Sequence, residues 1–103
     1  MIMKILILLH KGFSSPMADA ALKTARAAKA AGHETQVFAM SDGVTLLGRE
    51  DFASLAKDGV AVTVCEHNRA QYKAPDKVAG VKYGSQYDLA GYVNDADRVV
   101  SFT

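Results

Sequence analysis

Cys65 is the single cysteine of the chain and the residue best suited to nucleophilic chemistry. The thiolate rather than the thiol is the nucleophile, and a helix N-terminus or a nearby cation lowers the pKa of a thiol. A helix beginning after Cys65, together with His67, Arg69 and Lys11, would act in this direction, whereas the carboxylate of Glu66 would oppose it. We take Cys65 as the candidate nucleophile, and His67 and Lys11 as its candidate catalytic partners.

Two other interpretations of Cys65 stay open. Free cysteine is among the most buried residue types, so the side chain can simply fill space in the core. A metal site would need His10, Asp42 and His67 beside the thiol, and no close-set pair such as CxxC or HxxxH supports it. We therefore expect no metal and no organic cofactor. A single cysteine also excludes an internal disulfide, which fits a reducing compartment.

Three short polar groups follow apolar runs that are expected to be strands: residues 10–12, 41–43 and 65–67. Ligands in open parallel sheets bind beyond the carboxyl ends of the strands. We expect a ligand site at this edge, built from His10, Gly12, Ser41, Asp42, Gly43 and Arg69. The loop at residues 12–15 lacks the GxGxxG and GxxxxGK[ST] patterns, so a nucleotide is weakly supported. Tyr83, Tyr87 and Tyr92 are further pocket candidates, although such tyrosines more often pack against the domain or a partner subunit.

The composition describes one domain covering residues 1–103, with half of the residues hydrophobic. Twelve basic side chains against eleven acidic ones leave a net charge of +1 without a basic block, so no nucleic-acid partner is expected. The apolar run at residues 5–9 is too short for a signal peptide, and no stretch is long enough to span a bilayer. We expect no membrane partner and a cytoplasmic location.

The elements that position these residues follow from apolar periodicity and helix-capping signals. Strands are predicted over residues 2–9, 34–40, 60–65 and 97–102, and helices over 17–31, 50–57 and 87–94. Ser15 is the expected N-cap and Pro16 the first helical residue of the first helix, which Gly32 ends. Asp42 is expected to cap a short turn over 44–47.

The segment 66–81 is polar and has a weaker pattern. It predicts a short helix over 67–72, closed by Pro75, and then either a strand or a loop over 81–85. The alternation of strands and helices predicts a parallel sheet with helices on both faces, and no repeat or linker divides the chain.

Four segments, taken in order, resemble the DsrE/DsrF-like family of small sulfur-relay proteins, which includes the TusD-type subunits. They are residues 3–7, 38–44, 59–65 and 95–102. The resemblance implies a three-layer α/β/α sandwich around a mainly parallel five-stranded sheet. It also implies a homo-oligomer, often a trimer or hexamer, with sulfur donor and acceptor proteins as partners.

In relay members of the family, a cysteine at the end of the third strand carries sulfur as a persulfide, and Cys65 is at the matching position. The resemblance therefore implies a sulfur carrier or sulfurtransferase. The family commonly shows small and apolar residues leading to an Arg-Gly pair after this cysteine. Here Glu66-His67-Asn68-Arg69-Ala70 follows, so Arg69 is the expected replacement for the usual cation. A small-ligand-binding or oligomeric regulatory module of the same fold is the alternative.

Overall fold

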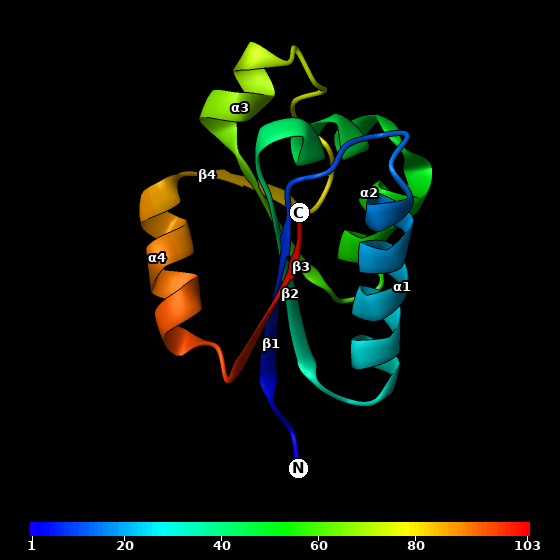
Figure 1. Ribbon diagram of the computed structural model, residues 1–103, viewed down its shortest axis with the longest axis vertical. Coiled ribbons are helices and arrows are strands. Elements are labelled where there is room, and N and C mark those ends of the chain that lie inside the picture. The colour runs from blue at the N-terminus through cyan, green and yellow to red at the C-terminus, as the bar shows by residue number, and fades with distance from the viewer.

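Five strands form a single parallel sheet in the order β4-β3-β2-β1-β5. Figure 1 shows this sheet nearly edge-on, with helices on both sides. The computed structural model describes all residues from Met1 to Thr103. The strands are β1 (Lys4–Leu9), β2 (Glu34–Ala39), β3 (Ala61–Cys65), β4 (Val81–Gly84) and β5 (Arg98–Phe102). β1 is therefore an inner strand, which agrees with its continuous apolar sequence.

The helices cover the two faces of the sheet unequally. They are α1 (Pro16–Ala30), the 3-10 helix η1 (Ser41–Gly48), α2 (Glu50–Lys57), α3 (Glu66–Gln71) and α4 (Gln86–Asp95). The chain steps from β1 to β2 to β3 in one direction and returns from β4 to β5 in the other. Because such crossovers are right-handed, α1 and α2 lie on one face and α4 lies alone on the other (Figure 1).

Local sequence signals explain where the two main covering helices begin. The Ser15 hydroxyl accepts a hydrogen bond from the amide of Met17 at 3.1 Å, and Pro16 is the first helical residue, so the expected start of α1 is confirmed. α4 begins one residue earlier than expected, because Ser85 and Asp88 form a capping box. These caps fix both helices at the carboxyl edge of the sheet.

The hydrophobic core lies mainly on the face covered by α1 and α2, where seventeen buried residues form one cluster. The opposite face has a cluster of only three buried residues, Leu6, Phe38 and Cys65. None of the residues of α4 is buried. The α4 side is thus the lightly covered half of the sandwich.

The expected fold class is confirmed, and residues 81–84 form a strand, which settles the choice left by the sequence. One local prediction is wrong. Asp42 does not cap the turn after β2, because η1 begins at Ser41 and has no side-chain cap. The Asp42 carboxylate instead accepts a hydrogen bond from the Tyr72 hydroxyl. None of the helices combines the length and hydropathy that a membrane-spanning segment needs.

Candidate functional site

Cys65 is the last residue of β3 and lies beside Gly84, the last residue of β4. Its side chain lies on the α4 face, where it clusters with Leu6 and Phe38. Cys65 is only 3% exposed. The expected strand-end position is therefore found, but the thiol is covered rather than open to solvent.

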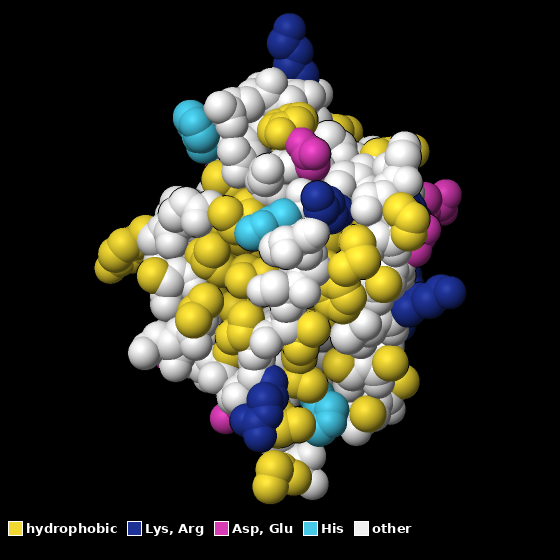
Figure 2. Space-filling view, viewed as in Figure 1, with side chains coloured by type: hydrophobic (Ala, Val, Ile, Leu, Met, Phe, Trp, Pro, Cys, Tyr) yellow, Lys and Arg dark blue, Asp and Glu magenta, His cyan; other side chains and the backbone are white.

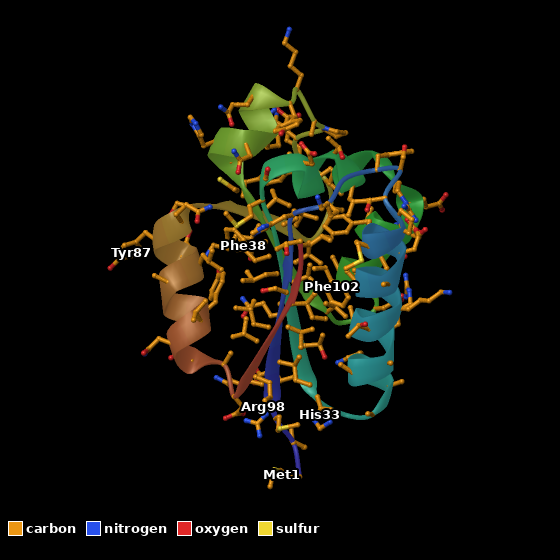
Figure 3. All side chains as sticks on the ribbon, viewed as in Figure 1. Met1, His33, Phe38, Tyr87, Arg98 and Phe102 are labelled. Atoms are coloured by element: carbon orange, nitrogen blue, oxygen red, sulfur yellow. The ribbon has the colours of Figure 1, made fainter.

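The cover over Cys65 comes from α4 and from the end of β2. Leu89 and Tyr92 of α4 pack against the Cys65 cluster, as does Met40. The ring of Tyr92 meets Phe38 edge-on, with 6.3 Å between the centroids. In Figure 3, Phe38 lies between α4 and the sheet while Tyr87 projects outward, and Tyr87 is 88% exposed. Of the three tyrosines considered from the sequence, Tyr92 alone lies over the thiol cluster.

His10 lies at the same edge of the sheet as Cys65, two strands away. The amide of Met40 donates to the Leu9 carbonyl, and Ala39 is the register partner of Val64. Extending this register by one residue places His10, Met40 and Cys65 in one row across the sheet, with Met40 in the middle. The Nε2 atom of His10 is buried without a hydrogen-bond partner. The topology thus brings His10 to the thiol's edge without direct contact.

Lys11 and Gly12 line a separate hollow of about 390 Å³ at this edge, together with Asp42 and Thr45. Gly12 and Thr45 pack closely in this hollow, because a Cβ at Gly12 would lie 2.7 Å from Oγ1 of Thr45. Thr45 also accepts a hydrogen bond from the Phe13 amide at 2.9 Å. Cys65 does not line this hollow, so Lys11 and the thiol belong to different surfaces.

Ser41 and Asp42 bind α3 and the residue after it. The Ser41 amide donates to Oδ1 of Asn68 at 2.9 Å, and Ser41 itself has a positive φ of 54°. The hydrogen bond to Asp42 raises the pKa of Tyr72 above its ordinary value. Gly43 is buried, and a Cβ there would collide with the Leu9 carbonyl oxygen. These three residues therefore dock α3 and the start of η1 onto the sheet edge.

Glu66 and Arg69 form a bidentate ion pair on α3. The Nε and Nη2 atoms of Arg69 donate to the two carboxylate oxygens of Glu66 at 2.7 and 2.9 Å. This pairing lowers the pKa of Glu66 and raises that of Arg69. Arg69 also donates to the Ala74 carbonyl at 3.3 Å. Arg69, which the sequence suggested as a cation for the Cys65 sulfur, is thus paired with Glu66. This pairing offsets the negative charge of Glu66 beside the thiol.

His67 is exposed on α3, and neither His67 nor Lys11 makes a hydrogen bond or ion pair. No group of three or more histidine, cysteine, aspartate or glutamate side chains is arranged to hold a metal ion. The structure thus brings His10 into line with Cys65, and leaves His67 and Lys11 free at the same edge.

The residues that sequence reasoning missed are Met40, Gly84 and Leu89. Met40 and Leu89 cover the thiol cluster, and Gly84 lies beside Cys65. The available signal was the Ser85–Asp88 capping pattern, which predicts that a helix begins directly after β4 but not which residues it covers.

Comparisons with known proteins agree with this architecture. The model of the DsrE/DsrF-like family matches residues 3–102. The crystal structure of the YchN protein from E. coli superposes with a TM-score of 0.82 at 20% identity, covering 99% of this chain and 100% of that one. MTH1491 of Methanobacterium thermoautotrophicum, a protein of unknown function, gives a TM-score of 0.77 at 16% identity, covering 96% and 98%. No curated protein matches. At these identities the two structures support the fold.

Proposed function

The chain belongs to the DsrE/DsrF-like family, which is linked in general to sulfur relay, and from this premise we propose that Cys65 carries sulfane sulfur as a persulfide. The observation that supports the proposal most directly is the placement of the only cysteine at the carboxyl end of β3. The chain leaves β3 into α3 and leaves β4 toward α4, so both connections start at the carboxyl edge of the sheet. Ligands of open sheets bind beyond the carboxyl ends of the strands.

The transfer needs no oxidant and no cofactor. The Cys65 thiolate attacks the outer sulfur of a donor persulfide, a new S–S bond forms, and the old S–S bond breaks with the donor thiolate as leaving group. An acceptor thiolate then attacks the outer sulfur of the Cys65 persulfide and releases the Cys65 thiolate. One sulfur atom moves in each step, and no electrons are gained or lost overall.

The burial of Cys65 suits storage of a reactive sulfur, because a covered persulfide is shielded from stray thiols. The cover itself is light, since no residue of α4 is buried. Local opening of weakly packed elements requires little free energy. In the proposed cycle, α4 moves away from Leu6 and Phe38 while the donor or acceptor thiol reaches Cys65. His10, in the same row, and the exposed His67 on α3 are the candidates for stabilising the thiolate, whereas Lys11 lines a different surface.

Mass spectrometry of the intact protein tests this function. After incubation with a sulfane-sulfur donor and removal of the donor, wild-type protein should gain the mass of one sulfur atom. Cys65→Ser should gain nothing, and Lys29→Ser, which alters an exposed side chain on the other face, should behave as wild type. A wild-type protein that gains no mass, or a Cys65→Ser variant that gains as much as wild type, contradicts the proposal.

The alternative function, a regulatory module in which Cys65 only packs, is favoured by the 3% exposure of the thiol. It predicts that Cys65→Ala keeps every binding property of the wild type and that no donor loads the protein. The same loading experiment therefore separates the two functions.

We also propose that the chain assembles with copies of itself, a trimer or hexamer being the form that the family resemblance implies. β5 is an edge strand with an unpaired side, and Val99 and Val100 on it are 42% and 37% exposed. Figure 2 shows hydrophobic side chains gathered across the middle of the molecule on this side. An exposed apolar edge strand favours pairing with another chain.

Light scattering during gel filtration tests the assembly. Val99→Lys should shift the protein toward monomer. Lys23→Val, at an exposed position of α1, should not. A wild-type monomer at all concentrations rules the assembly out.

A further inference from the structure

A second candidate site lies at the opposite edge of the sheet from Cys65. A cleft of about 250 Å³ opens at the amino ends of the strands, between the sheet and the last turn of α4. Its floor contains Leu6, Gln36 and Ala61, which are register partners on three neighbouring strands. Tyr92 and Asp95 of α4 form its wall. Pockets for drug-sized ligands have volumes of roughly 300–1,000 Å³, so this cleft suits a smaller molecule.

Gln36 is a polar side chain in an otherwise apolar floor. It is half-buried between Leu6 and Ala61, and its amide makes no hydrogen bond to the protein. The glutamine amide offers two donors and an acceptor, and it is not among the buried atoms that lack a partner, so it remains open to solvent in the cleft. The floor therefore presents an unused hydrogen-bonding group to whatever occupies the cleft.

Charged groups of both signs surround the cleft. Lys82 donates to the Tyr92 hydroxyl at 3.1 Å and lies 5.6 Å from the centroid of its ring, so a preference for a cation comes from the C-terminal end of α4. The Asp95 carboxylate ends α4 and has no hydrogen-bond or ion-pair partner. α1, α2 and α3 each have a basic residue in the last turn, but α4 has none. A helix C-terminus carries partial negative charge, which adds to that of Asp95. At the rim, Lys4 and Glu34 lie 3.9 Å apart and largely offset each other.

We propose that this cleft binds a small molecule that carries a primary ammonium group on a short apolar body. The ammonium donates to the Asp95 carboxylate and to the side-chain oxygen of Gln36. The apolar body lies on Leu6 and Ala61, against the ring of Tyr92. Leu6 and Tyr92 also belong to the cover of Cys65, but Asp95, Gln36 and Ala61 do not, and binding at the cleft requires no sulfur transfer.

Titration of ¹⁵N-labelled protein with n-butylammonium chloride tests the proposal by NMR. The side-chain amide of Gln36 and the backbone amide of Ala61 should shift and saturate, with a dissociation constant on the order of millimolar for so small a ligand. Sodium butyrate should cause no saturable shift, and 1-butanol should bind more weakly. No saturable shift with n-butylammonium, or equal binding of butyrate, overturns the proposal.

Two variants and two controls sharpen the test. Asp95→Asn should weaken n-butylammonium binding about threefold to tenfold, the range for one partly exposed charge contact. Asp76→Asn removes an equal charge from an exposed loop and should leave binding unchanged. Ala61→Leu fills the floor and should abolish binding while Asp95 is intact. Unchanged binding in both Asp95→Asn and Ala61→Leu would place the ligand elsewhere. Cys65→Ser should bind as wild type, so failure of the sulfur proposal leaves this one standing.

Discussion

Gly84 has no side chain, and the capping residues of α4 occupy the space that this leaves beside Cys65. The two residues are register partners at the ends of β3 and β4. A Cβ at Gly84 would lie 2.6 Å from Oδ2 of Asp88 and 3.0 Å from Cγ2 of Thr63. The Asp88 carboxylate accepts from the Ser85 amide at 2.9 Å as part of the capping box. The absence of a side chain at Gly84 thus allows α4 to begin where it covers the thiol.

Gly84→Ala should therefore loosen α4 and speed alkylation of Cys65 by iodoacetamide. In wild-type protein the reaction should be much slower than in urea-unfolded protein, because the thiol is buried. Gly91→Ala is the matched control within α4, since a Cβ there meets no atom within 4 Å. It should leave the rate unchanged or lower it, because alanine favours the helix. Equal rates for the two variants would show that Gly84 does not control access to Cys65.

Gly43→Ala should lower the free energy of unfolding by about 1–3 kcal/mol, the usual range for overpacking. The new methyl group would collide with the backbone carbonyl of Leu9, which cannot rotate away. Urea denaturation followed by circular dichroism measures the change. Gly48→Ala provides the comparison, because its Cβ would lie at an ordinary 3.6 Å from the Phe13 ring. If Gly43→Ala proves as stable as Gly48→Ala, the tight contact between η1 and β1 is not rigid.

Arg49 joins α1, α2 and the loop after β1, and Arg49→Met should cost about 1–2 kcal/mol at neutral pH. The guanidinium donates to Asp51 at 2.6 Å, to Asp19 at 2.7 Å and to the Phe13 carbonyl at 3.0 Å. Arg98→Met is the control, since Arg98 binds only the Asp97 carbonyl. Thermal or urea unfolding of both variants measures the difference. An equal, small loss in both would contradict the role of Arg49.

The same cluster predicts a pH dependence. The hydrogen bond from Arg49 holds the pKa of Asp51 below its ordinary value of 3.8. A carboxyl group with a lowered folded-state pKa stabilises the protein above its unfolded-state pKa, and this stability is lost as pH falls through the folded-state value. The stability difference between wild type and Arg49→Met should therefore begin to shrink below about pH 3.8 and be smallest below the lowered folded-state pKa of Asp51. A constant difference between them down to strongly acidic pH would exclude this linkage.

Arg69→Met should raise the pKa of Glu66 toward its ordinary value of 4.5, because the hydrogen bonds from Arg69 are the main cause of its lowering. Carbon-13 NMR of the side-chain carboxyl group during an acid titration measures this shift. The variant should also increase amide hydrogen exchange at residues 72–74, since Arg69 binds the Ala74 carbonyl. Lys73→Met is the neighbouring control and should change neither quantity. An unaltered Glu66 titration in Arg69→Met would refute the ion pair.

Local sequence predicts the elements of this fold well, because caps and apolar periods act over a few residues. The helix over 50–57 is found with the same bounds, and α1 is shifted by one residue. Gly32 and Gly59 have φ angles of 89° and 91° just past their helices, as expected for helix-ending glycines. The fold class follows from the alternation of these elements.

The surroundings of Cys65 could not be predicted in the same way. The row of His10, Met40 and Cys65 depends on the strand order and register, which no local pattern fixes. The cover over the thiol comes from α4, and Leu89 lies 24 residues further along the chain than Cys65. The pairing of Glu66 with Arg69 could have been predicted from the sequence, because the two residues are three apart on one helix.

The position of β1 inside the sheet also has a consequence for synthesis of the chain. Its two neighbours are β2, which follows closely, and β5, whose docking involves the Lys4–Asp97 hydrogen bond between residues 93 positions apart. While the chain is being made, one side of β1 stays unpaired until residues 98–102 have left the ribosome. Unpaired apolar strands of this kind expose nascent chains to aggregation. Dependence on chaperones should therefore fall sharply once residues 98–102 are free to pair.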